Sequence, residues 1–341
     1  MKYKKIFLST EFLNEKTAKT KAKVDVIEIL EKAGYHSVYF PKVNSIGQVI
    51  KFWGELSKLV TKGSHLVLEY PCYPRKRMWL IWAFKKVKGI KLYGVIHDIG
   101  DLRFTDEEHK DGNDMHFLKL YDGLVSHNAS MTRWLRENGF RKPIVDLHVF
   151  DYCLAQQTDF NEQVLNGKFK VLYAGNLAFN KATYIYDENV GKLNNVHLGV
   201  YGPYFEKERI KGSSLSYKGM FDPQAPDLKE KYHFGLIWEG ESTETCSGQM
   251  GRYIRFNNPH KFSLYISLGL PVIVWKEAAV APFILQNGIG TTIESFEDLE
   301  RLGDRVTQKE YSEYLVNIRA LSERVRNGYF LNQAVNQLVN S

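Results

Sequence analysis

The sequence predicts an α/β protein with two doubly wound domains. Buried strand patterns alternate with helical patterns through roughly the first 150 residues, and the alternation begins again near residue 170. The chain has 341 residues, about 2.3 times a typical domain length, so its size also favours two domains. A polar stretch at 151–168 separates the two regions and is interpreted as their connector.

Strands of the first half are expected where apolar and β-branched residues cluster, at 5–9, 37–40, 65–70, 91–96, 123–126 and 144–149. Helices are expected between them, at 23–34, 49–59, 78–87, 117–121 and 129–138. Gly34 and Gly139 are typical helix stop signals. Helical crossovers of this length join parallel strands, so residues 1–152 are predicted to form one mostly parallel domain.

The second half repeats this organisation, and we assign residues 166–325 to a second domain. Its strands are expected at 170–174, 196–201, 215–217, 235–238, 271–275 and 290–293. Its main helices are expected at 223–232, 259–268 and 311–325. A last helix at 331–339 lies in the segment 326–341, which can return to the N-terminal domain.

Composition describes an ordinary globular chain, with 44% hydrophobic and 25% charged residues. The three cysteines, Cys72, Cys153 and Cys246, are widely spaced and odd in number, which predicts a reducing, cytoplasmic location. No run of 18 apolar residues predicts a membrane span. The net charge of +7 suits an anionic ligand, an anionic lipid surface or a nucleic acid without choosing among them.

Several common catalytic motifs are absent from the sequence. There is no G-x-x-x-x-G-K-[ST], no G-x-G-x-x-G at a strand-to-helix turn, no H-E-x-x-H and no G-x-S-x-G. The Asp-x-Asp pair that carries a divalent metal in many sugar transferases is also missing, so no metal is expected. The short acidic run Asp111-Gly-Asn-Asp114 is interpreted as a solvated turn rather than a calcium loop.

The most informative segment is 258–274, in which a polar turn leads into a helix, Gly269 and a buried strand. Lys261 falls in the first turn of that helix, where free backbone N–H groups and the helix dipole already favour an anion. A cation in that position predicts a diphosphate site that needs no metal. A solvated lysine on an ordinary helix is the alternative.

This segment resembles the nucleotide-binding half of GT-B glycosyltransferases. Within them the chain is most similar to a bacterial group that includes glucosyltransferase-three-like enzymes and β-1,6-galactofuranosyltransferases. The similarity lies in four stretches, YGVIHDI at 93–99, LYAGN at 172–176, FGLIW at 234–238 and the segment 261–274. It implies two facing Rossmann-like domains with a cleft between them, a UDP-sugar donor and a metal-independent chemical step.

The resemblance also implies a donor site in the C-terminal domain. Gly175 and Asn176 would line it, Lys181 and Lys261 would bind phosphate, and His260 would lie beside Lys261. The uracil would be cradled by Tyr217, Gly219 and Met220. A turn at 9–10 with Lys16 to Lys21 resembles a loop that reaches over the nucleotide. Many GT-B enzymes carry a glutamate where this chain has Leu264, so one sugar contact of those enzymes is missing here.

On the acceptor side, the candidates are His97 and Asp98, which follow a buried strand. Asp98 is the preferred base if the reaction inverts configuration, and a helix cap is its alternative role. His97 is either a second catalyst or a satisfied core histidine. If configuration is retained, no side-chain base is needed. In the donor half, Glu239 follows a buried strand and is the best candidate for a contact with the donor sugar.

A helix at 75–86 mixes basic residues with Trp79, Trp82 and Phe84. It predicts either a contact with an anionic lipid surface, where a lipid-linked acceptor would be found, or an ordinary core helix with a charged end. No nucleic-acid-binding motif appears. We therefore expect a homo-oligomeric transferase that moves galactofuranose or glucose from a UDP-sugar to a saccharide acceptor. A catalytically silent module that binds a glycan or a partner enzyme is the alternative.

Overall fold

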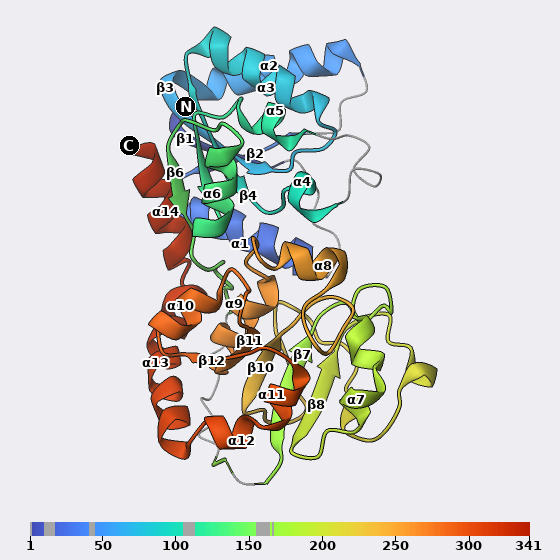
Figure 1. Cartoon of the computed structure of the whole chain (residues 1–341). Coiled ribbons are helices and arrows are strands. Elements are labelled where there is room, and N and C mark those ends of the chain that lie inside the picture. Colours follow the sequence, from blue (N-terminus) through green and yellow to red (C-terminus); the bar gives the residue numbers. More distant parts are fainter. Residues whose placement is uncertain (1, 10–17, 41–44, 105–112, 155–163, 166) are drawn as a thin grey trace. The chain divides into compact units, whose positions relative to one another are not determined.

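The computed structural model describes every residue except 1, 10–17, 41–44, 105–112, 155–163 and 166. The chain divides into two compact units. Unit 1 comprises Met1–Glu15, Ala22–Leu147 and Tyr329–Ser341, and unit 2 comprises Lys16–Lys21 and His148–Gly328. The first unit therefore contains the last helix of the chain as well as the N-terminal half (Figure 1).

Unit 1 is a six-stranded parallel sheet with the order β2-β1-β3-β4-β5-β6. Its strands are β1 (Tyr3–Ser9), β2 (His36–Tyr39), β3 (Val60–Tyr70), β4 (Lys91–Ile96), β5 (Gly123–Ser126) and β6 (Ile144–Asp146). Its helices are α1 (Ala18–Lys32), α2 (Ile46–Leu59), α3 (Lys76–Lys88), α4 (Gly100–Arg103), α5 (Asp114–Leu118), α6 (Ala129–Glu137) and α14 (Tyr329–Val339). The strands β1, β3, β4, β5 and β6 lie side by side in that order, and β2 pairs with the other edge of β1.

Local sequence explains where several of these elements begin and end. The Asn128 side chain accepts hydrogen bonds from the backbone of Ser130 and Met131 and so caps α6. Gly89 ends α3 in a left-handed conformation with φ of 61°. Helix α14 packs on β5 and β6, and a Cβ at Gly123 would lie only 2.7 Å from Cδ1 of Leu338. The absence of a side chain at Gly123 thus lets the last helix close on the N-terminal sheet.

Unit 2 is a second six-stranded parallel sheet, with the order β12-β11-β10-β7-β8-β9. Its strands are β7 (Phe169–Ala174), β8 (Val196–Tyr201), β9 (Leu215–Tyr217), β10 (Phe234–Ile237), β11 (Val272–Trp275) and β12 (Gly290–Ile293). Its helical elements are η1 (Thr183–Tyr186), α7 (Glu188–Gly191), η2 (Lys207–Arg209), α8 (Gly248–Tyr253), α9 (His260–Ser267), α10 (Ala281–Gln286), α11 (Phe296–Glu300), α12 (Leu302–Arg305) and α13 (Gln308–Arg326). The prediction of two doubly wound α/β domains is confirmed.

One predicted helix, at 223–232, is wrong. The described chain there is a turn closed by an isolated bridge between Asp222 and Ala225, followed by irregular chain and a bend. Two prolines within four positions, Pro223 and Pro226, remove helical hydrogen bonds. Tyr232 instead packs on β8, where its hydroxyl would lie 2.1 Å from a Cβ at Gly199.

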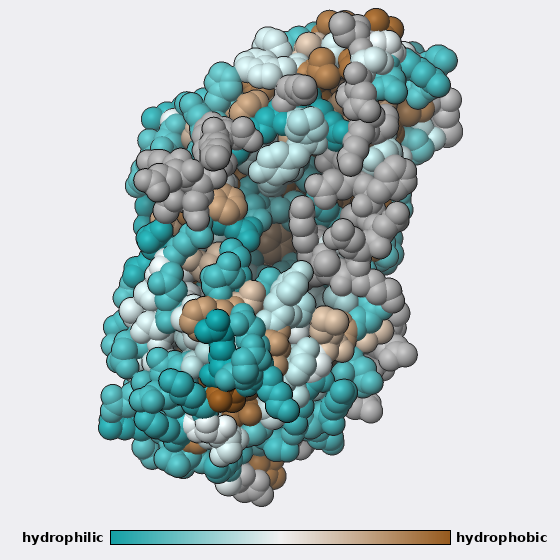
Figure 2. Space-filling view, turned by 90° about the vertical axis from the view of Figure 1, so that its right-hand side faces the viewer, coloured by the Kyte–Doolittle hydropathy of each residue, from teal (hydrophilic) through white to brown (hydrophobic). Residues whose placement is uncertain are grey.

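The surface is mainly hydrophilic on the face shown in Figure 2, and apolar residues form several separate patches there. No helix of the described chain is long and apolar enough to cross a membrane. Helix α3 directs Met78, Ile81 and Phe84 into the core, as the core-helix interpretation predicts. Trp79 remains 41% exposed.

Candidate functional site

Strand order places a site in unit 2 between β7 and β10. The chain runs outward from β7 through β8 and β9, then returns to the other side of β7 with β10, β11 and β12. In open α/β sheets, ligands bind at the carboxyl ends of the strands beside such a reversal. The segments that follow β7 and β10 at this edge begin with Gly175 and Trp238.

A tyrosine hydroxyl lies between β7 and β10 where their pairing ends. The two strands pair at Val171 and Leu172 but no further, although β7 pairs with β8 as far as Ala174. The hydroxyl of Tyr265, from α9, accepts a hydrogen bond from the Ala174 backbone N–H at 2.9 Å and donates one to the Leu236 carbonyl at 3.2 Å. It therefore satisfies backbone groups that would otherwise be unpaired in a buried place.

Lys261 and Glu239 form an ion pair at this edge. Lys261 is the second residue of α9, and Glu239 lies two residues beyond β10. Nζ of Lys261 is 2.6 Å from Oε1 of Glu239, and the two side chains are 9% and 15% exposed. The ammonium group also lies over the ring of Tyr173, 3.9 Å from its centroid. The lysine predicted to hold a diphosphate is thus buried, charged and fixed in direction.

The electrostatics of the pair keep the lysine protonated. Burial alone would lower the pKa of Lys261, but Glu239, together with the Tyr173 and Tyr265 side chains, outweighs burial and holds that pKa above its ordinary value. Burial, helped by Glu239, raises the pKa of the Tyr173 phenol. At neutral pH the site therefore contains a cation, a carboxylate and a neutral phenol beside the N-terminus of α9.

Gly175 adjoins the ion pair, and its lack of a side chain keeps that space open. A Cβ at Gly175 would lie 3.4 Å from Nζ of Lys261. Asn176 follows and uses Oδ1 to accept a hydrogen bond from the Ala178 backbone, which shapes the turn after β7. Lys181 is half-buried and forms no ion pair with any residue that the structure describes, so its ammonium group is available to an anion.

The predicted uracil-binding residues gather at the ends of β8 and β9. The Tyr217 ring stacks on Phe205, with centroids 4.4 Å apart, and its hydroxyl donates to the Gly202 carbonyl at 3.1 Å. Gly219 has φ of 92°, and its carbonyl accepts a hydrogen bond from Gly202. Met220 is 67% exposed. The ring of Phe205, which the sequence analysis did not single out, therefore covers one face of Tyr217.

His260 precedes Lys261 but packs in a different environment. Its ring lies 5.1 Å from that of Tyr152 and 6.0 Å from that of Phe150. These contacts hold the start of α9 against the segment that enters unit 2. His260 is thus adjacent to the lysine in the chain, and its ring is surrounded by aromatic residues.

Only the end of the predicted N-terminal loop lies within the described residues, because 10–17 are outside them. Lys21 is buried, with Nζ 2.5 Å from the carbonyl oxygen of Cys153 and 4.9 Å from the centroid of the Tyr152 ring. These contacts do not direct Lys21 toward a ligand, and its role above a nucleotide stays a prediction. A backbone carbonyl and an aromatic face already surround its charge.

In unit 1, the two acceptor-side candidates have different partners. Nε2 of His97 lies 2.8 Å from Oε1 of Glu69, a residue near the end of β3 that the sequence analysis missed. Asp98 accepts a hydrogen bond from Arg103 at 2.7 Å, and both side chains of this pair are at least 30% exposed. Glu69 could have been noticed as the single acidic residue in an otherwise apolar strand end, Leu66 to Tyr70.

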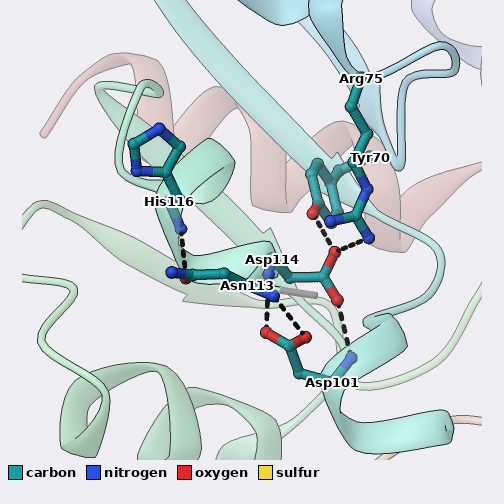
Figure 3. Close-up of polar contacts among 6 residues, drawn as sticks. All are labelled: Tyr70, Arg75, Asp101, Asn113, Asp114 and His116. Carbon is teal, nitrogen blue, oxygen red and sulfur yellow. Dashed lines mark hydrogen bonds and ion pairs between the residues drawn. The ribbon is translucent and has the colours of Figure 1, made fainter. Parts of the chain in front are cut away.

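The interpretation of the acidic run at 111–114 as a solvated turn is wrong for Asp114, which is fully buried and is held by the polar contacts drawn in Figure 3. Oδ1 of Asp114 accepts hydrogen bonds from the Tyr70 hydroxyl and from Arg75, the latter at 2.7 Å. Its Oδ2 accepts from the Asp101 backbone N–H at 2.8 Å, and Asp101 in turn accepts from the backbone of Asn113 and Asp114. Arginine and tyrosine donors compensate the buried charge, so the cluster ties α4 and α5 to the end of β3.

Among the described residues, no group of three His, Cys, Asp or Glu side chains is arranged to hold a metal ion. The charged groups at the unit 2 edge suit a different ligand, an anion that meets Lys261, Lys181 and the N-terminal N–H groups of α9.

Comparison with known proteins identifies the family. Residues 5–149 match the N-terminal domain of the glucosyltransferase 3-like family, and residues 171–338 match its C-terminal domain. The chain belongs to the glucosyltransferase 3-like family. It is 30% identical over 342 aligned positions to the β-1,6-galactofuranosyltransferase WbbI of Escherichia coli (strain K12), with 98% of each chain covered.

Solved structures agree with this glycosyltransferase assignment at the level of the fold. The lipopolysaccharide outer core galactosyltransferase WaaB matches 98% of this chain and 99% of its own, with a TM-score of 0.63 and 12% identity. Anabaena HepE, solved with UDP and glucose, matches 99% of both chains with a TM-score of 0.61 and 13% identity. The GT-B fold and the glycosyltransferase family inferred from the sequence are confirmed.

Proposed function

We propose that this protein transfers a hexose from a UDP-sugar to a hydroxyl group of a saccharide acceptor, without a metal in the chemical step. The observation that carries the proposal is the buried ammonium group of Lys261, held by Glu239 at the N-terminus of α9 beside the β7–β10 reversal. The departing diphosphate gains negative charge during transfer, and a preorganised cation with helix N–H groups stabilises that charge.

The spacing of the donor residues supports a nucleoside diphosphate. Tyr217 is the last residue of β9, whereas Lys261 and Glu239 lie at the β7–β10 edge, and β8 lies between β9 and β7. Two strand spacings amount to about 9.5 Å, the scale on which a nucleoside places its base from its diphosphate. Under this proposal Tyr217, Gly219 and Met220 hold the base, and Lys181 and Lys261 hold the phosphates. HepE, a structural neighbour, was solved with UDP and glucose.

Glu239 has two roles in this proposal. Its carboxylate directs Lys261 toward the phosphates, and in this proposal its second oxygen accepts a hydrogen bond from a hydroxyl of the donor sugar. The family name points to glucose, and the name of the Escherichia coli relative points to galactofuranose. Galactofuranose is our first choice, since that relative is 30% identical along almost the whole chain.

Helix α3 gives little support to a lipid-surface role. Arg75 is bound to Asp114, Arg77 lies over the ring of Phe40, and Lys85 is bound to Asp122. These basic residues neutralise or cover groups inside the fold. We therefore propose a saccharide acceptor in surface glycan, glycolipid or glycoprotein synthesis, and light scattering of the purified protein tests the expected homo-oligomer.

Thermal unfolding with UDP, GDP, ADP and UDP-sugars tests the donor. A ligand at 100 times its Kd adds about 2.7 kcal/mol of stability, so a shift selective for UDP and one UDP-sugar is expected. Lys261→Ala should abolish the shift and lower transfer by about two to three orders of magnitude. Lys192→Ala, which removes an exposed lysine paired with Glu188, is the matched control and should change neither. If wild-type protein responds to no nucleotide, the silent binding module replaces this proposal.

A further inference from the structure

Exposed aromatic rings gather beside the carboxyl end of β3. Tyr73 lies in the segment that follows this strand, and Trp79 is the fourth residue of α3; the two residues are 45% and 41% exposed. The ring of the exposed His116, the third residue of α5, has its centroid 5.1 Å from that of Trp79. In the strand order of unit 1, β3 borders the reversal at β1, and ligands of open α/β sheets bind at the carboxyl edge beside such a reversal.

A buried polar cluster holds the helices that carry these rings (Figure 3). Asp114, the first residue of α5, accepts hydrogen bonds from the Tyr70 hydroxyl at the end of β3 and from Arg75, which directly precedes α3. The side chain of Arg75 also interacts with that of Tyr73. The starts of α3 and α5 are therefore fixed to the end of β3, and the rings lose little conformational freedom when they bind a ligand.

The charges of this cluster disfavour an anionic ligand. Nη2 of Arg75 is 2.7 Å from Oδ1 of Asp114, and both side chains are buried. Asp101 adds a second carboxylate, which accepts hydrogen bonds from the backbone of Asn113 and Asp114. With two carboxylates and one guanidinium group, the cluster repels a phosphate or an anionic lipid headgroup. The exposed Lys86 lies in the last turn of α3, about 10 Å along the helix axis from the turn that carries the indole. An uncharged ligand is therefore favoured at the rings.

A saccharide has the chemistry that the rings and their neighbours match. One face of a sugar ring consists mainly of C–H groups, whose small positive charge packs against the negative face of an aromatic ring. Sugar hydroxyl groups need hydrogen-bond donors and acceptors beside the rings, and the exposed His116 and Asn113 supply them. Oδ1 of Asn113 accepts a hydrogen bond from the His116 backbone N–H at 3.1 Å, and Nδ2 of Asn113 has no partner among the residues that the structure describes. An aromatic surface with a few polar groups beside it is typical of small-molecule sites.

We propose that Trp79, Tyr73 and His116 form a saccharide-binding site of unit 1, an inference that rests on the proposed glycosyl transfer for its choice of ligand. A neutral sugar residue stacks one face on the Trp79 indole, and Tyr73 extends the aromatic surface. The sugar hydroxyl groups bind the His116 imidazole and Nδ2 of Asn113. Arg75 is a positioning residue, because it is buried behind the rings. Every residue of the site belongs to unit 1, so its occupation can be measured without a nucleotide.

Saturation-transfer NMR with methyl glycosides of glucose, galactose and N-acetylglucosamine tests the site on the intact chain. At least one glycoside should receive saturation, mainly on the C–H protons of one ring face. Trp79→Ala should weaken that binding by about tenfold, whereas Trp79→Phe, which keeps an aromatic face, should weaken it less. Tyr329→Ala is the matched control, because Tyr329 is a 40% exposed aromatic residue of the same unit, and should bind as wild type does. Unchanged circular dichroism and UDP affinity should show that the three variants fold.

Wild-type protein that binds UDP but none of the glycosides would overturn the inference and leave the proposed function intact. Equal glycoside affinity in wild type and Trp79→Ala would overturn it as well. Cosedimentation with phosphatidylglycerol vesicles covers the membrane alternative, since vesicle binding that is lost in Trp79→Ala, without glycoside binding, would assign the rings to a lipid surface instead. Glycoside binding that depends on Trp79, in a protein that binds no UDP, would keep this site while the proposed function fails.

Discussion

The ammonium nitrogen of Lys261 lies 2.6 Å from a carboxylate oxygen of Glu239, although the two residues belong to different elements of the sheet edge. The pair is the centre of the proposed donor site, and its charges are largely removed from water. Each partner therefore compensates the other until an anionic ligand arrives. Substitutions at Lys261 and Glu239 should therefore change the free energy of unfolding and the affinity for UDP to different extents.

Lys261→Met should lower the free energy of unfolding by about 1–3 kcal/mol, because Glu239 is left as an unpaired, mostly buried carboxylate. Adding Glu239→Gln should recover most of this loss, since the remaining amide carries no charge. Urea unfolding of the single and double variants measures both effects. UDP binding should stay lost in the double variant, and a double variant that binds UDP normally would contradict the role of Lys261.

Asp114→Asn should cost about 3–5 kcal/mol, because Arg75 loses its buried partner (Figure 3). Denaturant unfolding measures the loss. Asp98→Asn is the comparison, since its ion pair with Arg103 is partly exposed and should contribute no more than about 1 kcal/mol. Equal losses in the two variants would show that the Asp114 cluster does not stabilise the unit 1 fold.

Tyr265→Phe should destabilise the protein by about 1–3 kcal/mol, because the Ala174 N–H is left buried without its acceptor. Amide hydrogen exchange at Ala174 should accelerate with it. Tyr217→Phe removes a hydroxyl from an exposed ring and should cost less. An Ala174 amide that remains equally protected in Tyr265→Phe would mean that β7 and β10 do not need this bridge.

We predict that the protein loses stability in mild acid because His127 is buried in its neutral form. Its pKa is lowered from 6.5 to about 3 by burial and by His97, so the unfolded chain binds a proton below pH 6.5 that the native state refuses. The stability that His127 contributes is therefore present above pH 6.5 and falls as the pH drops toward 3, by roughly 5 kcal/mol at most.

His127→Gln should flatten this dependence when the free energy of unfolding is measured between pH 7 and 4. A slope remains, because the pKa values of His65, His197 and His233 are also lowered by burial. An unchanged slope in His127→Gln would show that His127 is not the dominant group.

Much of the fold follows from local sequence patterns. Apolar runs predicted every strand of both sheets, and β5 and β12 have the predicted bounds because a buried strand needs only a short apolar run between turn residues. Prolines at 223 and 226 were an available warning against the helix predicted there. Short helices such as α7 and α12, with four residues each, have too few residues to show a helical period.

The candidate site could likewise be predicted only in part from the sequence. Lys261 could be predicted because a helix start, a glycine and a buried strand follow one another along the chain. Its pairing with Glu239 depends on β10 and α9 meeting beside β7. The hydrophobic periodicity of the sequence gives no information about such a meeting of distant segments. Glu69 and His97 are 28 positions apart, and Arg75 and Asp114 are 39 apart. The sequence by itself determined which segments are buried and led to the prediction of an anion site at Lys261. Strand order alone decided which charges meet, because a buried charge is stable only where the fold brings it a partner.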